Sequence, residues 1–343
     1  MSIRLVASAA ALELVGLLAA SLVSPSRASA EESLFFAGKT MRLVVGMPPG
    51  GGVDIYARLV QRYIEQHLPG KPSIVAQNMP GAGSLRAVQS LAASPDDGTV
   101  ILTFSSSLVT ESIISPERVK ADFRTFSFLG NVAEDSRVCF VRAAIAFKNW
   151  PEFAQREGVV FGGTAAGTSG NLDVAILRNL LGVKLKLVQG YAGSADKRLA
   201  LEKGEIDGDC AGATSLPDGW VKTGKVSVVI KHSASAMPGI PPTVPYAGAL
   251  LKDPADRRVY DFLVTPQLFG RLFLVSAKVP PERLATLRKA FDAAMADPAF
   301  RAEAAKLGLA VSPTPGAEVD KNISALYATP PKIIARAMAI ARE

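Results

Sequence analysis

Short runs of β-branched and aliphatic residues alternate with amphipathic helical stretches along this chain, and this alternation restricts the fold more than any other feature. In the first third, strands are predicted at residues 41–46, 73–77 and 99–104. The helices predicted between them, at 54–68 and 84–93, repeat apolar residues every three or four positions. Strands and helices in this order form parallel βαβ units, with helices on both faces of a sheet. The sequence therefore predicts an α/β domain.

The alternation begins again after residue 130 and predicts a second α/β unit. Its strands are expected at residues 137–141, 159–161, 185–188, 206–210 and 225–231, and its helices at 172–181 and 195–203. After a proline-rich stretch, the last third offers a strand at 271–276 and helices at 281–295, 298–307 and from about 330. We expect two domains, because some 300 residues exceed what one core normally holds.

The expected division has the chain crossing between the domains twice, near residues 131–137 and 231–237, so that the two crossings form a hinge. Residues 31–134 and 235–343 form the first domain, and residues 135–234 form the second.

The first 30 residues have the pattern of a secretory signal peptide. Arg4 precedes a run of small and apolar residues, and Ala28-Ser29-Ala30 offers a cleavage site before Glu31. No later stretch approaches the roughly 20 apolar residues that a membrane span needs. We expect cleavage after Ala30 and export to the periplasm as a soluble protein.

The formal net charge is +7, and it becomes +6 when residues 1–30, with two arginines and one glutamate, are removed. A modest positive charge suits anionic small molecules. The Lys and Arg residues are scattered rather than clustered, which argues against a nucleic-acid partner.

Cys139 and Cys210 lie in predicted strands, and an oxidising compartment would allow them to form a disulfide. Two buried thiols that behave as small apolar residues are the alternative, and both stay open. With no C-x-x-C motif and only His67 and His232, no metal site is predicted.

Glycines and small hydroxyl residues are concentrated where predicted strands give way to helices. Glycine allows the backbone to approach a ligand closely, and a helix N-terminus presents unpaired N–H groups with partial positive charge, so such loops suit a carboxylate or phosphate. One such loop can be a plain turn, but five at corresponding places favour a binding site. The predicted ligand contacts are Pro49, Gly50, Gly51, Gly52, Asp54, Asn78, Gly81, Ala82, Gly83, Ser105, Ser106, Thr164, Gly167, Thr168, Ser169, Tyr191, Gly193, Ser194 and Asp207.

Two of the acidic residues have alternative roles. Asp54 is placed to cap the helix at 54–68, which is the commoner role for Asp there and the one that we prefer. Asp207 stands at the end of a predicted strand, where acids more often belong to turns or to the surface.

Enzyme motifs are missing from the sequence. There is no G-x-x-x-x-G-K-[ST], no G-x-S-x-G, and Arg86 stands where the third glycine of a dinucleotide fingerprint would follow Gly81 and Gly83. Two isolated histidines give little scope for a Ser-His-Asp arrangement. We therefore expect a binding protein that needs no cofactor.

The chain resembles the Bug family, the receptors of tripartite tricarboxylate transporters. The resemblance is carried, in order, by Leu43-Val44-Val45, Pro48-Pro49-Gly50-Gly51 with Asp54, Asn78, Pro80-Gly81-Ala82-Gly83, Pro95-Asp96-Asp97-Gly98-Thr99, Gly204-Glu205-Ile206-Asp207, Pro238-Gly239-Ile240-Pro241 and Pro280-Pro281. It implies a type II periplasmic-binding-protein fold, with two α/β lobes joined by two crossing strands. It also implies a carboxylate ligand between the lobes, held largely by backbone amides and bridging waters.

Two loops depart from the family pattern. Tyr191-Ala192-Gly193-Ser194 lacks the lysine that many members carry there, and the family's serine and histidine pattern is altered to Thr168-Ser169-Gly170-Asn171. The identity of the ligand therefore does not transfer from relatives.

The function expected is that of a monomeric receptor that binds one small mono- or dicarboxylate and delivers it to a membrane permease of the tripartite tricarboxylate type. A receptor that reports to a sensor kinase is the alternative, and a secreted α/β enzyme is less favoured. The sequence does not indicate which carboxylate, which permease or which sensor is the partner.

Overall fold

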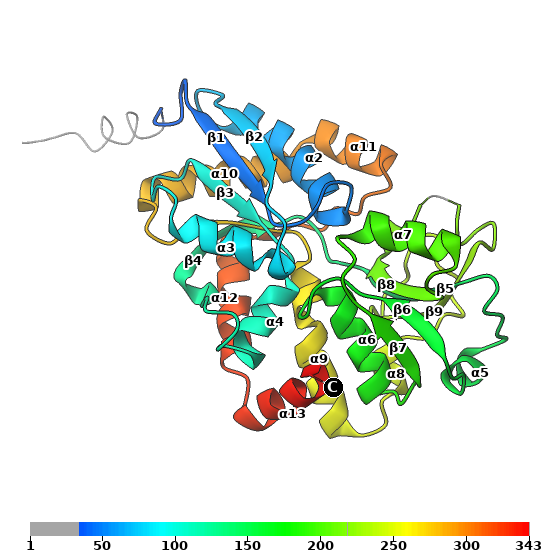
Figure 1. The fold of residues 1–343 in the computed structure, drawn as a ribbon. Helices are drawn as coiled ribbons and strands as arrows, with labels where there is room; N and C mark the ends of the chain where they lie inside the picture. Colours follow the sequence, from blue (N-terminus) through cyan, green and yellow to red (C-terminus); the bar gives the residue numbers. More distant parts are fainter. Residues whose placement is uncertain (1–33, 218, 343) are drawn as a thin grey trace, which may run out of the picture.

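Two β-sheets, one in each lobe, organise the chain (Figure 1). The structure is a computed structural model that describes residues 34–217 and 219–342, so the predicted signal peptide lies outside the described residues. The first sheet has the strand order β11-β4-β10-β3-β1-β2 and the second has the order β7-β6-β8-β5-β9. These two sheets form the two-lobed α/β fold that the sequence predicts.

The first sheet is parallel on one side and antiparallel on the other. Strand β1 pairs in parallel with β2 and β3, whereas β10 runs antiparallel between β3 and β4. Every side chain of β3 is buried, as expected for a strand with helices on both faces. The strands are β1 (Thr40–Val45), β2 (Ser73–Asn78), β3 (Val100–Thr103), β4 (Phe126–Asn131), β10 (Leu272–Ser276) and β11 (Thr314–Pro315).

The second sheet has the same mixed character. Strand β6 pairs in parallel with β7 and β8, and β5 lies antiparallel between β8 and β9. Its strands are β5 (Arg137–Arg142), β6 (Val159–Gly162), β7 (Leu185–Val188), β8 (Gly208–Gly212) and β9 (Val226–Lys231).

The helices flank the two sheets, and most of the predicted ones are present within a few residues of their expected bounds. The helices of the first lobe are α2 (Gly52–His67), α3 (Leu85–Ala92), α4 (Ser107–Ile114), α10 (Pro281–Ala296), α11 (Pro298–Lys306) and α12 (Gly316–Tyr327). The remaining ones are α5 (Trp150–Ala154), α6 (Ser169–Asn179), α7 (Ser194–Lys203), α8 (Ala247–Leu250), α9 (Pro254–Val264) and α13 (Pro331–Arg342), with short 3-10 turns η1 (Ala82–Ser84), η2 (Phe123–Thr125), η3 (Ala213–Ser215) and η4 (Thr265–Phe269). The sequence did not predict β4, α4, α9 or α12.

Two connections between the lobes run side by side. The first passes from β4 to β5, and the second enters β10. They are joined where the N–H of Asp135 donates to the carbonyl of Gln267 at 2.7 Å, and the N–H of Val132 donates to the carbonyl of Arg271 at 3.1 Å.

The second connection therefore lies further along the chain than the expected crossing at 231–237. Residues just after the expected crossing still pack with the second lobe, because Met237 and Val244 belong to the same apolar cluster as Val138 and Phe140 of β5.

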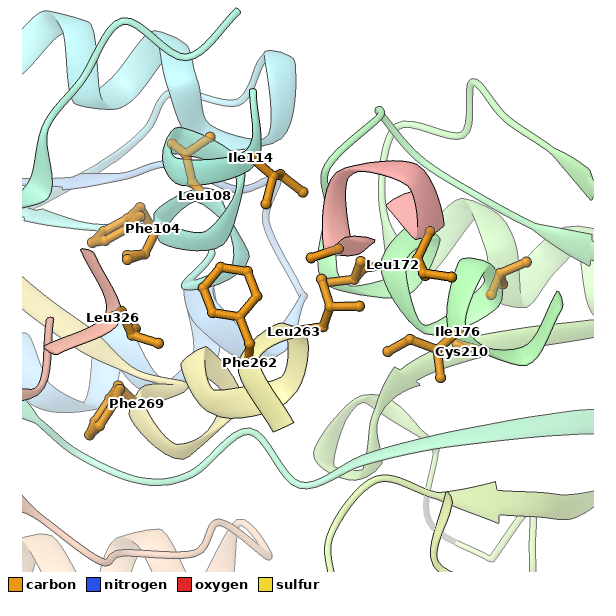
Figure 2. Close-up of a cluster of buried hydrophobic side chains, with 14 of the residues drawn as sticks. Phe104, Leu108, Ile114, Leu172, Ile176, Cys210, Phe262, Leu263, Phe269 and Leu326 are labelled. Carbon is orange, nitrogen blue, oxygen red and sulfur yellow. The ribbon is translucent and has the colours of Figure 1, made fainter. Parts of the chain in front are cut away.

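A continuous apolar layer joins the lobes beside these connections. Figure 2 shows Phe104, Leu108 and Ile114 of the first lobe, Phe262 and Leu263 of α9, and Leu172 and Ile176 of α6 in one cluster. The C-terminal helix α13 contacts α4, α6 and α9 and buries Ala337 and Ile340 in the same layer. Across the described part of the chain, no helix combines the length and the apolar character that crossing a membrane requires.

Candidate functional site

A cavity of about 120 Å³ lies between the lobes. Its walls come from the loops that follow β1, β3 and β6, and from the connections between the lobes, which contribute Asp135 and Arg271. This is where ligands bind in open α/β sheets, beyond the carboxyl ends of the parallel strands. The cavity is small compared with the roughly 300 Å³ or more of pockets for drug-sized molecules. Its size therefore suits a compact ligand.

Three helices begin at this cavity. The first turns of α2, α6 and α7 contribute Gly52, Ser169 and Ser194 to its wall. Within the described chain, the N-cap residues of these helices, Gly51, Thr168 and Gly193, make no side-chain capping bond. Helices α3, α4, α10 and α12 also have no side-chain cap, whereas asparagine or aspartate side chains cap α5, α9 and α11. Uncapped first turns keep N–H groups and partial positive charge available at the cavity.

Hydroxyl groups from both lobes add donors and acceptors. Ser105 lines the cavity from the first lobe, and its Oγ lies 2.9 Å from that of Ser107. Thr164 and Thr168 line it from the second lobe, with their Oγ1 atoms 2.8 Å apart. The wall is thus polar on both sides of the cleft.

Three buried cations also contribute to the wall, and each is paired. Arg137 donates to Asp135 at 3.1 Å and to Asp173 at 2.5 Å. Arg271 donates to Asp135 at 2.8 Å, while Lys197 pairs with Asp209. A buried charge is tolerated only when it is paired and hydrogen-bonded. These pairs fix the positions of the cationic groups around the cavity.

The buried network sets the charge of its members. Burial favours the neutral form of Asp135, but Arg271 and Arg137 outweigh it and hold the pKa of Asp135 below its ordinary value. Burial lowers the pKa of His232 despite the nearby carboxylate of Asp173, so the imidazole is neutral at pH 7. Asp135 is shared by Arg137 and Arg271, and the helix N-termini add partial positive charge, so the cavity attracts an anion.

A hydrogen-bond network behind the cavity holds the loop between β1 and α2 in place. Asp54 is buried and accepts hydrogen bonds from the N–H of Gly50 at 3.0 Å, from Arg58 Nε at 3.1 Å and from Asn78 Nδ2 at 2.7 Å. Asn78 Nδ2 also donates to the carbonyl of Met47 at 2.9 Å. Asp54 and Asn78 therefore position the loop from behind and do not line the cavity.

The structure brings nine of the predicted contact residues to the cavity wall. They are Pro49, Gly51, Gly52, Ser105, Thr164, Thr168, Ser169, Gly193 and Ser194. The other ten are not part of the wall, and two of them, Gly83 and Gly167, lie where the lobes meet. A Cβ added to Gly83 would lie 3.3 Å from Thr168 Cγ2, and one added to Gly167 would lie 2.5 Å from Glu111 of α4. At these two places the lobes touch each other.

Asp207 has a different role from the predicted one. Its carboxylate pairs with Arg142 at 2.7 Å and accepts from the N–H of Val160 at 3.0 Å, so it joins β5 to β6 away from the cavity. Tyr191, Gly50, Gly81, Ala82 and Ser106 also lie outside the wall.

Sequence reasoning missed Arg137, Lys197 and Arg271. A signal was available for two of them, because Arg137 and Arg271 each begin a predicted strand. A charged residue that is buried in a strand needs an acidic partner, so these positions could have indicated a buried ion pair.

The two cysteines form a disulfide in the structure. Cys139 of β5 and Cys210 of β8 are directly opposed in the antiparallel pair, and their sulfur atoms are bonded. The carbonyl oxygen of Cys210 accepts from Arg137 Nη2 at 3.3 Å and from Lys197 Nζ at 3.5 Å. The disulfide therefore anchors the residue whose carbonyl oxygen binds two of the cavity cations.

In the described ranges, no group of three or more His, Cys, Asp or Glu side chains is placed to hold a metal ion.

Comparisons with known proteins agree with this architecture. The model of the tripartite tricarboxylate transporter family receptor matches residues 56–336. A UPF0065 protein of Bordetella pertussis (strain Tohama I) is 30% identical over 188 residues, which are 52% of this chain and 56% of that protein. The chain thus spans a little over half the length of this relative, and the same holds for a second curated relative from Pseudomonas sp. (strain P51).

Solved structures show the same fold at low identity. The periplasmic binding protein BugD superposes with a TM-score of 0.72 at 20% identity, covering 90% of this chain and 99% of that one. MatC from Rhodopseudomonas palustris, solved with bound malate, gives 0.70 at 20% identity over 90% of this chain and 100% of its own. A further R. palustris protein, solved with adipate, gives 0.69 at 17% identity over 88% and 98% of the two chains.

Proposed function

The chain belongs to the tripartite tricarboxylate transporter receptor family, whose model covers residues 56–336, and from this premise we propose that it is a periplasmic receptor for a small organic carboxylate. The receptor captures the carboxylate between its two lobes and delivers it to a membrane permease of the tripartite tricarboxylate type. It acts as a monomer, without a cofactor and without changing the ligand chemically.

The observation that carries this proposal is the convergence of three uncapped helix N-termini, those of α2, α6 and α7, on one small cavity. Backbone N–H groups at a helix N-terminus bind anions, and the partial charge of the helix adds to the attraction. Because α2 belongs to the first lobe and α6 and α7 to the second, an anion in the cavity would be held from both sides.

The ligand class is supported by size and by similar proteins. A cavity of about 120 Å³ suits a molecule with few heavy atoms, and similar structures contain malate and adipate. We propose that the predicted residues on the wall hold the ligand and that those behind it position the loops.

Closure is proposed to occur about the paired connections at Val132–Asp135 and Gln267–Arg271. Two lobes joined by a short pair of strands can rotate as rigid bodies, and a ligand that contacts both lobes favours the closed form. The closed surface would then be recognised by the permease. A sensor-kinase partner is the alternative that the same binding event would serve.

The experiment is a thermal-shift and calorimetric screen of the mature protein with mono- and dicarboxylates of three to six carbon atoms, including malate and adipate. We expect saturable stabilisation that follows the ligand concentration. Recovery of the ligand unchanged after incubation distinguishes a receptor from an enzyme. If no carboxylate raises the melting temperature, or if the ligand is consumed, the proposal is wrong. N-terminal sequencing of the exported form should begin at Glu31.

A further inference from the structure

We propose that Arg271, Thr214 and the first turn of α2 form a subsite that binds one carboxylate of the ligand through a direct charged contact. This inference deepens the proposed function and rests on it. It assigns the ionic anchor of the site to a residue that immediately precedes β10.

The side chain of Arg271 is buried, and one of its three nitrogens makes no hydrogen bond in the described chain. Only 4% of it is exposed, its Nη1 donates to the carbonyl of Gly270 at 2.7 Å, and its Nη2 donates to Asp135 at 2.8 Å. Its guanidinium also lies over the ring of Tyr56, at 5.0 Å from the centroid. Nε is buried and finds no hydrogen-bond partner in the described chain. An unpaired buried donor costs free energy unless a ligand supplies the acceptor.

Thr214 presents a second unused donor at the same place. Its Oγ1 is buried and likewise lacks a partner among the residues that the structure describes. A Cβ added to Gly52 would lie 2.9 Å from Arg271 Nη2 and 3.4 Å from Thr214 Oγ1. The two side chains therefore converge on the first residue of α2, where the lack of a Cβ makes room for the guanidinium. Gly52 and Arg271 both line the cavity.

The charges around Gly52 also call for an anion. A helix N-terminus is a site of partial positive charge, and a guanidinium beside it is unfavourable when no negative group lies between them. Asp135 offsets part of the charge of Arg271, but it is shared with Arg137. A carboxylate would accept from Arg271, from Thr214 and from the backbone N–H groups of α2, and charge-assisted bonds of this kind are the stronger ones.

The subsite is assembled from three parts of the molecule. Gly52 belongs to the first lobe, Thr214 to η3 after β8 of the second lobe, and Arg271 to the connection between them. In this structure the three lie together across the boundary between the lobes, and a rotation that separates the lobes would move Gly52 away from Thr214. Binding of the carboxylate and closure are therefore linked, since the ligand makes its full set of bonds in the closed form alone.

The test compares Arg271→Lys and Thr214→Val with the wild type by calorimetric titration, using malate and adipate as probes. Arg271→Lys keeps a cation for Asp135 but loses the unused Nε, and we expect at least about a tenfold loss of affinity. Thr214→Val removes a hydroxyl that has no partner in the described protein, so we expect unchanged or higher stability and about a three- to tenfold loss of affinity.

Thr110→Val is the matched control. Thr110 of α4 also carries a buried hydroxyl without a partner in the described chain, but unlike Thr214 it is not among the side-chain atoms nearest to the Cβ position of Gly52. We expect the same small change in stability and unchanged affinity.

Three outcomes are distinguishable. Selective loss of affinity in Arg271→Lys and Thr214→Val supports the subsite. Wild-type affinity in both of these variants, with the wild type binding a probe, overturns the subsite and leaves the proposed function standing. If the wild type binds neither of these two probes nor any other carboxylate in the screen, the proposed function is wrong and the subsite falls with it.

Discussion

The carboxylate of Asp54 accepts a hydrogen bond of 3.0 Å from the backbone N–H of Gly50, four residues earlier in the chain. This bond closes the loop that precedes α2, and Arg58 and Asn78 bind the same carboxylate. Asp54 thus fixes the loop that supplies Gly51 and Gly52 to the cavity. The sequence indicated that Asp54 caps the helix, and this is corrected: α2 begins at Gly52 with Gly51 as its N-cap, and Asp54, inside the first turn, binds the loop that precedes the helix.

We expect Asp54→Ala to lower the free energy of unfolding by about 2–3 kcal/mol, because three donors lose a charged acceptor. Asp253→Ala is the control. Asp253 caps α9 through the N–H of Ala255 alone, and its loss should cost about 1 kcal/mol. Urea unfolding of both variants measures the difference. Equal costs would mean that the bonds from Arg58 and Asn78 add nothing to the bond from Gly50.

The same carboxylate predicts a pH dependence. Burial opposes ionisation of Asp54, but the bonds from Asn78, Gly50 and Arg58 outweigh it and hold its pKa below the ordinary value of 3.8. The stabilisation is therefore complete above pH 3.8 and is lost as the pH falls through the lower folded-state pKa. In urea titrations, the gap between wild type and Asp54→Asn should stay constant from about pH 7 to 5 and narrow below about pH 4. A gap that widens on acidification contradicts this assignment.

Gly52→Ala should weaken ligand binding by about tenfold or more, because the added Cβ would lie 2.9 Å from Arg271 Nη2 and would force the guanidinium to move. Stability should also fall, by about 1–3 kcal/mol, because the displaced guanidinium is buried and paired with Asp135. Gly182→Ala is the control for a loss of stability without a loss of affinity. With φ of +70° and no neighbour within 4 Å of its Cβ, it should lose about 1 kcal/mol of stability and keep full affinity. Calorimetry and melting curves of both proteins decide the matter.

Reduction of the Cys139–Cys210 disulfide should lower the free energy of unfolding by about 2–4 kcal/mol, because the bond closes a loop with a sequence separation of 71. Unfolding with and without dithiothreitol measures this. The double variant Cys139→Ala/Cys210→Ala should show no response to the reductant. Two titratable thiols in denatured, unreduced protein would refute the pairing.

The sequence predicts a helix well where only one face of the helix is buried. Helix α2 buries one face and exposes the other, so its apolar residues repeat with a helical period. Helix α4 is buried on nearly every side, including Glu111 and Ser112, and the period that would reveal it is absent. Glycine loops at strand ends correctly indicated much of the cavity wall, because the carboxyl ends of parallel strands meet at one edge of a sheet.

The charged part of the site depends on contacts between distant residues. Arg271 reaches the cavity because β10 inserts between β3 and β4, and nothing in its neighbouring sequence indicates that insertion. Asp207 illustrates the converse: it was among the predicted ligand contacts, but Arg142, 65 residues away, pairs with its carboxylate. Lys197 lies on a predicted helix, and the face that it occupies is set by Asp209 of the next strand.

Helix α13 contacts both lobes and therefore affects how they can separate. The helix occupies residues 331–342, contacts both α4 and α6, and receives a hydrogen bond of 2.7 Å from Asn179 at the carbonyl of Ile340. Because α4 belongs to the first lobe and α6 to the second, a rotation that moves these two helices apart would detach α13 from one of them. It would also expose apolar surface of Ala337 and Ile340 to water, so part of the free energy that opposes opening comes from a helix remote from the cavity.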